Sequence, residues 1–160
     1  MGRWLWWSVL IVVLDQVTKV IAEQWLLPLQ PLPVLPSFNL TLMYNTGAAF
    51  SFLAGAGGWQ RGLFIVLASV ISVVLVIWLL RLSRDQRLQA AALVLVLGGA
   101  VGNLIDRILY GHVIDFIQLY YQQWYWPTFN IADAAISVGA VLLIIDTLFY
   151  SGRETASDRQ

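Results

Sequence analysis

The feature that most constrains this chain is an uninterrupted apolar run at residues 63–80, LFIVLASVISVVLVIWLL. As an α-helix rising about 1.5 Å per residue, the run would span most of a hydrocarbon core about 30 Å thick. A helix that is apolar on every side is buried either in a large core or in a membrane. Because only 11% of the 160 residues are charged and 59% are hydrophobic, the run predicts a transmembrane helix.

Three further apolar segments of similar length predict three more spans. The first follows Arg3. It does not read as a cleaved signal peptide, because Asp15 interrupts it and no small-x-small cleavage site follows. We expect a single membrane domain over residues 1–160 with a polar tail at 151–160. The spans are expected at about 4–27, 62–80, 88–107 and 131–150.

The placement of arginine predicts the orientation of these spans. Most arginines flank the spans on one side of a four-span chain: Arg3, Arg81, Arg84, Arg87, Arg153 and Arg159. The other side carries only Arg61 and Arg107. The positive-inside rule therefore predicts cytoplasmic termini, with residues 28–58 and 108–128 outside. Asp106, Asp115 and Asp133 would then share the extracytoplasmic face.

The segment between the first two spans favours extended structure. Four prolines within 28–36 end the first helix, and residues 38–44 alternate between apolar and polar side chains as a strand does. Asn45-Thr46-Gly47 predicts a turn, after which residues 48–52 are expected to return as a second strand. We therefore expect a small extracytoplasmic β-cradle at about 37–53, lying at the membrane surface.

Residues 113–126 are rich in tyrosine and tryptophan and are expected to lie in the membrane interface as a helix. The expected fold class is therefore an α-helical integral membrane protein. It has four transmembrane helices, a small extracytoplasmic β-cradle and an interfacial helix.

Polar side chains gather in residues 98–136, at the end of the third span. Asn103, Asp106 and Arg107 are spaced i, i+3 and i+4, so they project together from one helix face. Gly98, Gly99, Ala100 and Gly102 come just before them, and small residues let membrane helices approach closely. Since ionisable groups at membrane depth are costly, the cluster indicates a functional site.

Two more pairs of polar residues extend this cluster. Asn130 is placed to cap the fourth helix, with Asp133 in its first turn. Asp15 and Lys19 lie four residues apart on one face of the first span, where a paired charge costs less than a single one. This second pair either fastens the first helix to the bundle or takes part in the chemistry.

Asp115 and Asp133 suggest an aspartate pair if the segment between them folds back. Two carboxylates that share a proton can activate water and protonate a leaving amine. Asp133 is favoured as the ionised member by its place in the first turn of a helix, which leaves Asp115 to hold the proton. Asp106, next to Arg107, is expected to stay ionised and to support the site.

Other chemistries fit the residues less well. A metal site built from Asp106, His112 and Asp115 matches no standard zinc spacing, and the chain has no cysteine. No serine lies near His112 to act as a nucleophile. We therefore expect no metal and no cofactor. Helix capping and a salt bridge between Arg107 and Asp106 would explain part of the cluster without any catalysis.

A transporter is the main rival class. A small ion- or proton-coupled transporter could use Asp15, Lys19 and Asp106 as a relay. Such a relay needs polar groups across the bilayer, whereas the run at 63–80 carries no charge and the acids crowd one face. The net charge of zero gives no indication of nucleic-acid binding.

Five blocks of the sequence together resemble the motifs of the bacterial lipoprotein signal peptidases, also called signal peptidase II. They occur in the family's order and cover essentially the whole chain: DQVTK at 15–19, NTGAAFSF at 45–52, GGAVGNLIDR at 98–107, GHVIDF at 111–116 and FNIADAAI at 129–136.

The resemblance implies a multi-pass aspartic endopeptidase of the bacterial cytoplasmic (inner) membrane, with its active site on the extracytoplasmic face. Such an enzyme removes the signal peptide from prolipoproteins, cutting before a cysteine that carries diacylglycerol. Asp115 and Asp133 match the catalytic pair. The residues that would support the site or hold substrate are Asp15, Lys19, Asn45, Asn103, Asp106, Arg107 and Asn130. The expected partners are lipid-modified prolipoproteins and membrane lipids, and the expected state is a monomer.

Overall fold

The structure, a computed structural model, describes residues 1–47 and 59–149. The return strand expected at 48–52 lies outside these residues. In chain order the elements are the 3-10 turn η1 (Gly2–Trp4), α1 (Leu5–Trp25), β1 (Leu32–Leu35), β2 (Phe38–Asn45), α2 (Trp59–Arg81), α3 (Arg87–Leu109), β3 (Val113–Tyr121), β4 (Trp124–Tyr125) and α4 (Ile131–Phe149).

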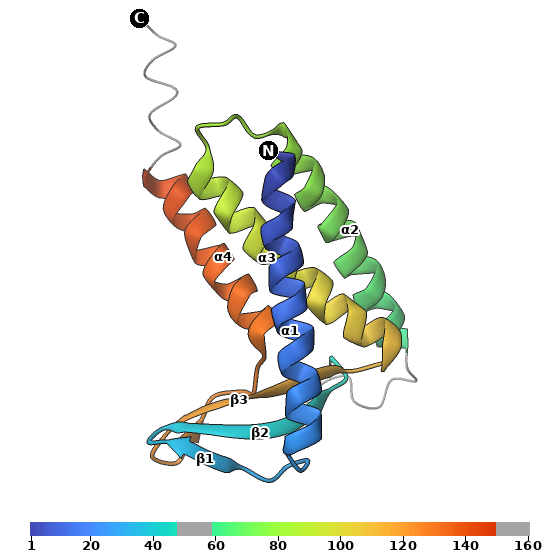
Figure 1. Cartoon of the computed structure of the whole chain (residues 1–160), viewed down its shortest axis with the longest axis vertical. Helices are drawn as coiled ribbons and strands as arrows, with labels where there is room; N and C mark the ends of the chain where they lie inside the picture. The colour runs from blue at the N-terminus through green and yellow to red at the C-terminus, as the bar shows by residue number, and fades with distance from the viewer. Residues whose placement is uncertain (48–58, 150–160) are drawn as a thin grey trace, which may run out of the picture.

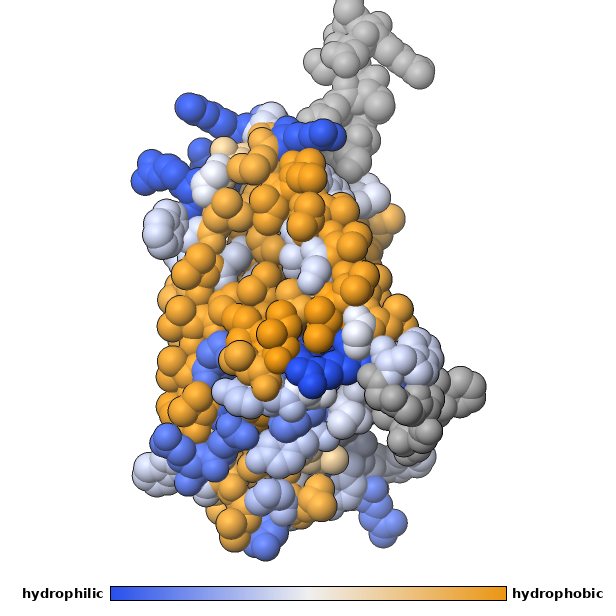
Figure 2. Space-filling model, turned by 90° about the vertical axis from the view of Figure 1, so that its right-hand side faces the viewer, coloured by the Kyte–Doolittle hydropathy of each residue, from blue (hydrophilic) through white to orange (hydrophobic). Residues whose placement is uncertain are grey.

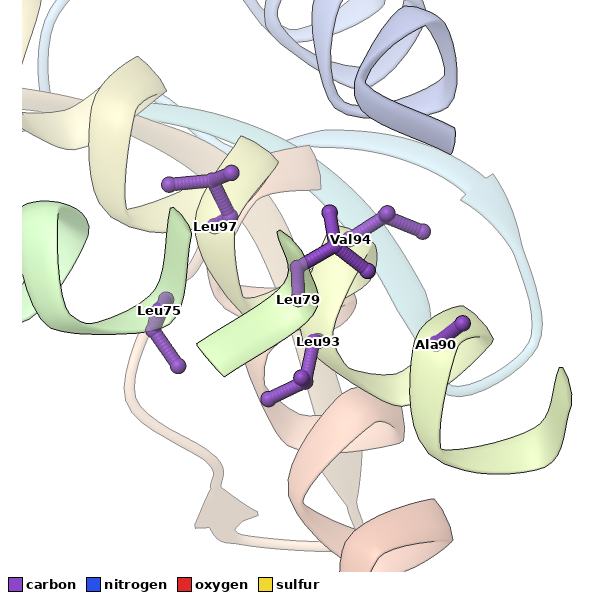
Figure 3. Packing of buried hydrophobic residues seen from close by; sticks show 6 residues of the cluster. All are labelled: Leu75, Leu79, Ala90, Leu93, Val94 and Leu97. Carbon is purple, nitrogen blue, oxygen red and sulfur yellow. The ribbon is translucent and has the colours of Figure 1, made fainter. Parts of the chain in front are cut away.

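The four helices form a bundle in which α3 packs against α1, α2 and α4 (Figure 1). A cluster of buried apolar side chains joins α2 to α3: Leu75, Leu79, Ala90, Leu93, Val94 and Leu97 (Figure 3). Close packing is the main source of attraction between helices in a bilayer, where lipid is as apolar as leucine. The small residues of α3 serve this packing, and they make α3 the central helix of the bundle.

The surface of the bundle is apolar. All four helices are long and apolar enough to cross a membrane. On the face shown in Figure 2, hydrophobic surface covers most of the bundle, and hydrophilic patches gather toward its two ends. Along α2, only Gln60, Leu75 and Leu79 are buried, and most of its apolar side chains are exposed. Exposed apolar surface of this extent is costly in water but favourable in lipid.

A four-stranded antiparallel sheet of order β1-β2-β3-β4 lies across one end of the bundle (Figure 1). The central pair β2–β3 is in register at Asn39 with Gln118, Met43 with Asp115 and Asn45 with Val113. A second apolar cluster attaches the sheet to the end of α1: Ala22, Leu26, Leu42, Ile114 and Phe116. The prediction of four helices beside a small sheet is confirmed.

The interfacial helix expected at 113–126 is wrong, because most of this segment is the strand β3 followed by the short β4. Val113–Phe116 is buried on both faces, and its β-branched and aromatic residues suit a strand between two layers. Pairing with β2 also supplies the backbone hydrogen bonds that an extended segment needs. The aromatic residues that suggested a helix lie at the far end of the sheet, where the Tyr120 and Tyr125 rings stack 5.5 Å apart.

Two glycines of α3 allow neighbouring elements to approach the helix closely. A Cβ at Gly99 would collide with the carbonyl oxygen of Ala132 in α4. A Cβ at Gly102 would lie 2.6 Å from Oδ2 of Asp15 in α1. Both contacts fall beside the polar cluster, so the small residues set its geometry as the sequence predicted.

Candidate active site

Lys19 forms the buried centre of the polar cluster. Its Nζ lies 2.8 Å from Oδ2 of Asp15 and 2.7 Å from Oδ2 of Asp106, and it donates to Oδ1 of Asn103 at 3.0 Å. The exposed fractions of Lys19, Asp15 and Asp106 are 1%, 0% and 0%. Removing one partner of a buried ion pair strands a charge at a cost of about 3–5 kcal/mol, so this group strongly constrains how α1 sits on α3.

Asp15 also reaches α4. Its Oδ1 accepts the backbone N–H of Ala132 at 2.9 Å, in the first turn of that helix. A carboxylate there satisfies an N–H that has no partner within the helix and is favoured by the helix dipole. The ion pair predicted between Asp15 and Lys19 is therefore present, and Asp15 uses it to join three helices.

Asp106 pairs with Lys19, whereas the sequence suggested a salt bridge to its neighbour Arg107. The Oδ2 atom of Asp106 also accepts the backbone N–H of Ile114 at 3.1 Å, which ties α3 to β3. Arg107 points the other way. Its guanidinium lies 5.3 Å from the centre of the Phe64 ring, and its Nη1 donates to the carbonyl of Asn103 at 3.3 Å.

Asn130 and Asp133 cap α4 as predicted. The Asp133 N–H donates to Oδ1 of Asn130 at 2.9 Å, and the Asn130 N–H donates to Oδ2 of Asp133 at 3.3 Å. This reciprocal pair is a capping box, with asparagine and aspartate in the places often held by serine and glutamate. The other oxygen of Asp133, Oδ1, accepts Nδ2 of Asn103 at 2.7 Å.

Asn130 also joins the two aspartates that the sequence singled out. While its backbone and Oδ1 hold Asp133, its Nδ2 donates to Oδ1 of Asp115 at 2.7 Å. The same Nδ2 lies 3.1 Å from Oδ1 of Asn103 and 3.2 Å from the carbonyl of Ile114. The fold-back expected from the sequence therefore exists, and it brings β3 to the first turn of α4.

Asp115 is 1% exposed and has no cation in direct contact among the described residues. Burial, and after it the charge of Asp133, raise the pKa of Asp115 to about 7. Hydrogen bonds from Asn45 and Asn130 and the charge of Lys19 oppose the rise without cancelling it. A carboxyl group with this pKa can both hold and release a proton near neutrality.

Asn45 approaches Asp115 from β2. Its Nδ2 donates to Oδ2 of Asp115 at 3.1 Å, and its Oδ1 accepts the Gly47 N–H at 2.8 Å. The second bond fixes which end of the amide faces Asp115. Gly47 has a φ of 87°, and a Cβ there would lie 2.5 Å from the Phe64 ring, so the turn requires glycine.

The structure thus brings together every residue that the sequence placed at the site, around two linked centres. One centre is Lys19 with its two carboxylates, and the other is Asn130 with Asp115 and Asp133. Asn103 connects them. Arg107 flanks the second centre, and its Nε is buried without a hydrogen-bond partner in the described part of the chain.

Sequence reasoning missed Gln16 and Arg61. Nε2 of Gln16 lies 2.8 Å from Oδ1 of Asp106 and 3.2 Å from Oδ2 of Asp15, so it bridges the two carboxylates. A polar side chain directly beside Asp15 in an apolar span was the available signal. Arg61 donates from Nε and Nη2 to the carbonyls of Arg107 and Ile108, at 2.9 and 3.0 Å, and so caps α3. No local pattern connects two segments so far apart in sequence.

His112 does not build a metal site. Its ring lies 4.6 Å from that of Tyr44, edge to face, and 6.2 Å from that of Tyr110. Within residues 1–47 and 59–149, no three His, Asp or Glu side chains gather in a way that could hold a metal ion.

Comparison with known proteins gives one consistent answer. The sequence model of the family described as signal peptidase (SPase) II matches residues 7–149. A lipoprotein signal peptidase of Pseudomonas syringae pv. tomato is 56% identical, over 99% of this chain and 94% of the relative. One of Pseudomonas fluorescens is 58% identical, over 89% and 85%. One of Acinetobacter baylyi is 52% identical, over 91% and 82%.

The fold gives the same result. A bacterial membrane enzyme solved by the in meso method superposes with a TM-score of 0.82 and 32% sequence identity, over 94% of this chain and 96% of that one. Fold and site thus define a multi-pass membrane protein of the aspartic peptidase class. The chain belongs to the signal peptidase II family, the lipoprotein signal peptidases. This membership replaces the transporter alternative.

Proposed function

We propose that this protein removes the signal peptide from diacylglyceryl-modified prolipoproteins, cutting before the lipid-modified cysteine, and that Asp115 and Asp133 are its catalytic pair. The observation that carries the proposal is the double use of Asn130, which donates from its side chain to Asp115 and from its backbone to Asp133. Two carboxylates held by one residue, one of them with a pKa of about 7, suit a pair that shares a proton.

In this mechanism Asp133 is the base. Both of its oxygens accept hydrogen bonds, from Asn103 and from Asn130, so its carboxylate is held in a fixed position at the start of α4. Asp133 removes a proton from a water molecule as the water attacks the scissile carbonyl, and Asp115 gives its proton to the carbonyl oxygen. When the tetrahedral intermediate breaks down, Asp133 passes its proton to the leaving amine. The hydroxyl proton returns to Asp115.

Asn45 and Arg107 are placed to hold the substrate in this scheme. Asn45 lies on the exposed end of β2 beside Asp115, and Arg107 retains donors that no described residue uses. A peptide in the site would offer backbone carbonyls to these donors. Because one chain supplies the whole pair and its partners, we also propose that the protein acts as a monomer.

The proposed orientation puts the sheet end of the bundle on the extracytoplasmic side of the bacterial inner membrane, with both termini in the cytoplasm. Arg3, Arg81, Arg84 and Arg87 lie at the other end of the bundle, near the start of α1 and the α2–α3 connection (Figure 1). The two arginines at the sheet end are engaged in the structure, Arg61 with carbonyls of α3 and Arg107 with Phe64 and Asn103. At that end, the aspartate pair would meet the scissile bond of a lipid-anchored precursor at the bilayer surface.

The test is single-turnover cleavage of a diacylglyceryl-modified prolipoprotein by the purified protein in detergent. Asp115→Asn and Asp133→Asn should each abolish cleavage while the protein still folds and binds the precursor. Asp106→Asn should lower turnover without abolishing it. Asp85→Asn is the matched control, because Asp85 is an exposed acid in the α2–α3 connection. This variant should cleave the precursor as the wild type does. Complete inactivity of a well-folded Asp106→Asn beside residual turnover in Asp115→Asn would overturn the assignment.

A further inference from the structure

Lys19 is too deeply buried to touch a substrate. It is 1% exposed, and the two carboxylates beside it are fully buried. An ammonium group has three N–H donors, and two of them are taken up by Asp15 and Asp106. The third reaches Oδ1 of Asn103 at 3.0 Å. Asn103 therefore links Lys19 to the aspartate pair through a single side chain, because it also donates to Asp133.

The contact with Lys19 determines how the Asn103 amide is oriented. An ammonium group can only donate, so Asn103 must present its carbonyl oxygen to Lys19. That oxygen also accepts Nδ2 of Asn130 at 3.1 Å. The amide nitrogen is consequently directed away from Lys19, and it donates to Oδ1 of Asp133 at 2.7 Å. With the amide reversed, a carbonyl oxygen would face Asp133 and this hydrogen bond would be lost.

We propose that Lys19 is a positioning residue for the peptidase reaction: its ammonium group holds Oδ1 of Asn103, so that Nδ2 of Asn103 donates to Asp133. This inference rests on the proposed function, in which Asp133 is the base. The other cation that interacts with the pair is Arg107, and the neutral donors to Asp115 are Asn45 and Asn130. Arg107 contacts the backbone carbonyl of Asn103, whereas the side-chain oxygen Oδ1 of Asn103 is held by Lys19 and Asn130. The charge of Lys19 also lowers the pKa of Asp115.

The variant that tests this must keep the net charge of the buried group at its wild-type value. Lys19→Met alone leaves Asp15 and Asp106 without their cation, and such a protein can fail to fold. The double variant Asp15→Asn with Lys19→Met removes one charge of each sign. Asp106 then keeps two donors, Gln16 and the Ile114 N–H. Asp15→Asn alone is the matched reference, because its Lys19 still contacts both Asp106 and Asn103.

Single-turnover cleavage of the diacylglyceryl-modified precursor is measured across pH for both proteins, alongside their melting in detergent. Relative to Asp15→Asn, the double variant should show both limbs of its pH–rate profile moved to higher pH by about one unit, the effect of losing a nearby cation. A lower melting temperature with unmoved limbs would assign Lys19 a structural role only and would overturn the proposal.

A second comparison shows whether the effect passes through Asn103. The same two proteins are made with Asn103→Ala, which removes the amide. The shift in the limbs of the pH–rate profile caused by Lys19→Met should then shrink by half or more. A full displacement in this background would mean that Lys19 acts only through space, which contradicts the positioning role. The proposed function is tested separately: it would be wrong if Asp115→Asn or Asp133→Asn still cleaved the precursor.

Discussion

Replacing Gly102 by alanine should destabilise the protein even though alanine favours helices. In an ordinary helix interior this change stabilises by about 1 kcal/mol. Here the new Cβ would lie 2.6 Å from Oδ2 and 3.1 Å from Cγ of Asp15, and 3.4 Å from the Cβ of Ala132. Asp15 is held on its other sides by Lys19 and by the Ala132 N–H, so it cannot retreat without losing a charge-assisted hydrogen bond.

The size of the effect follows from these terms. Overpacking of this kind costs about 1–3 kcal/mol, and a lost hydrogen bond to a charged group about 1.5–3 kcal/mol. After allowing for the gain in helix propensity, we expect Gly102→Ala to lower the free energy of unfolding by about 1.5–5 kcal/mol.

The assay is melting in detergent with Gly62→Ala as the matched control. Gly62 is also a helical glycine, near the start of α2, but a Cβ there meets nothing within 4 Å. Gly62→Ala should therefore melt at or above the wild-type temperature, and Gly102→Ala clearly below it. If Gly102→Ala melted as the control does, the close approach of α1 to α3 would be wrong.

Three further outcomes are expected. Because the pKa of Asp115 is raised to about 7, its proton is fully bound at low pH and is lost as pH rises through 7. Cleavage should fall over that range. The favourable effect of the neutral Asp115 on folding is complete below about pH 4 and should be lost as the pH rises toward 7. A cleavage rate that stays flat from pH 5 to 9 would refute this. EDTA should leave cleavage unchanged, because the described residues gather no metal-binding group, and loss of activity restored by added zinc would contradict it. Reporter fusions at Arg84 and Gln123 should report opposite sides of the membrane, and the same side for both would refute the four-span orientation.

The sequence predicted the helices well because their signal is local. An uncharged run such as 63–80 can adopt few structures in a chain of this composition, and α2 forms there. The capping of α4 by Asn130 and Asp133 was equally readable, since both residues lie within one helical turn. The Asp15–Lys19 pair was found for the same reason.

The prediction failed where pairing across the chain decides the structure. Val113–Tyr121 has no regular alternation, since Val113–Phe116 is buried on both sides, and only its partner β2 makes it a strand. The true partner of Asp106 is likewise on another helix. Adjacency to Arg107 suggested a salt bridge, whereas the side chains of consecutive helical residues diverge and Lys19 of α1 fills the space on the Asp106 side.

The division of the aspartate pair between the sheet and the helix bundle has a consequence for when activity can appear during assembly. Asp115 belongs to the sheet and Asp133 to the bundle, and Asn130 links them only when β3 docks on the start of α4. In a newly inserted chain whose sheet has not docked, the two carboxylates are not held together. Under the proposed function such a chain would be inactive, so neighbouring membrane proteins would not be exposed to an unassembled protease.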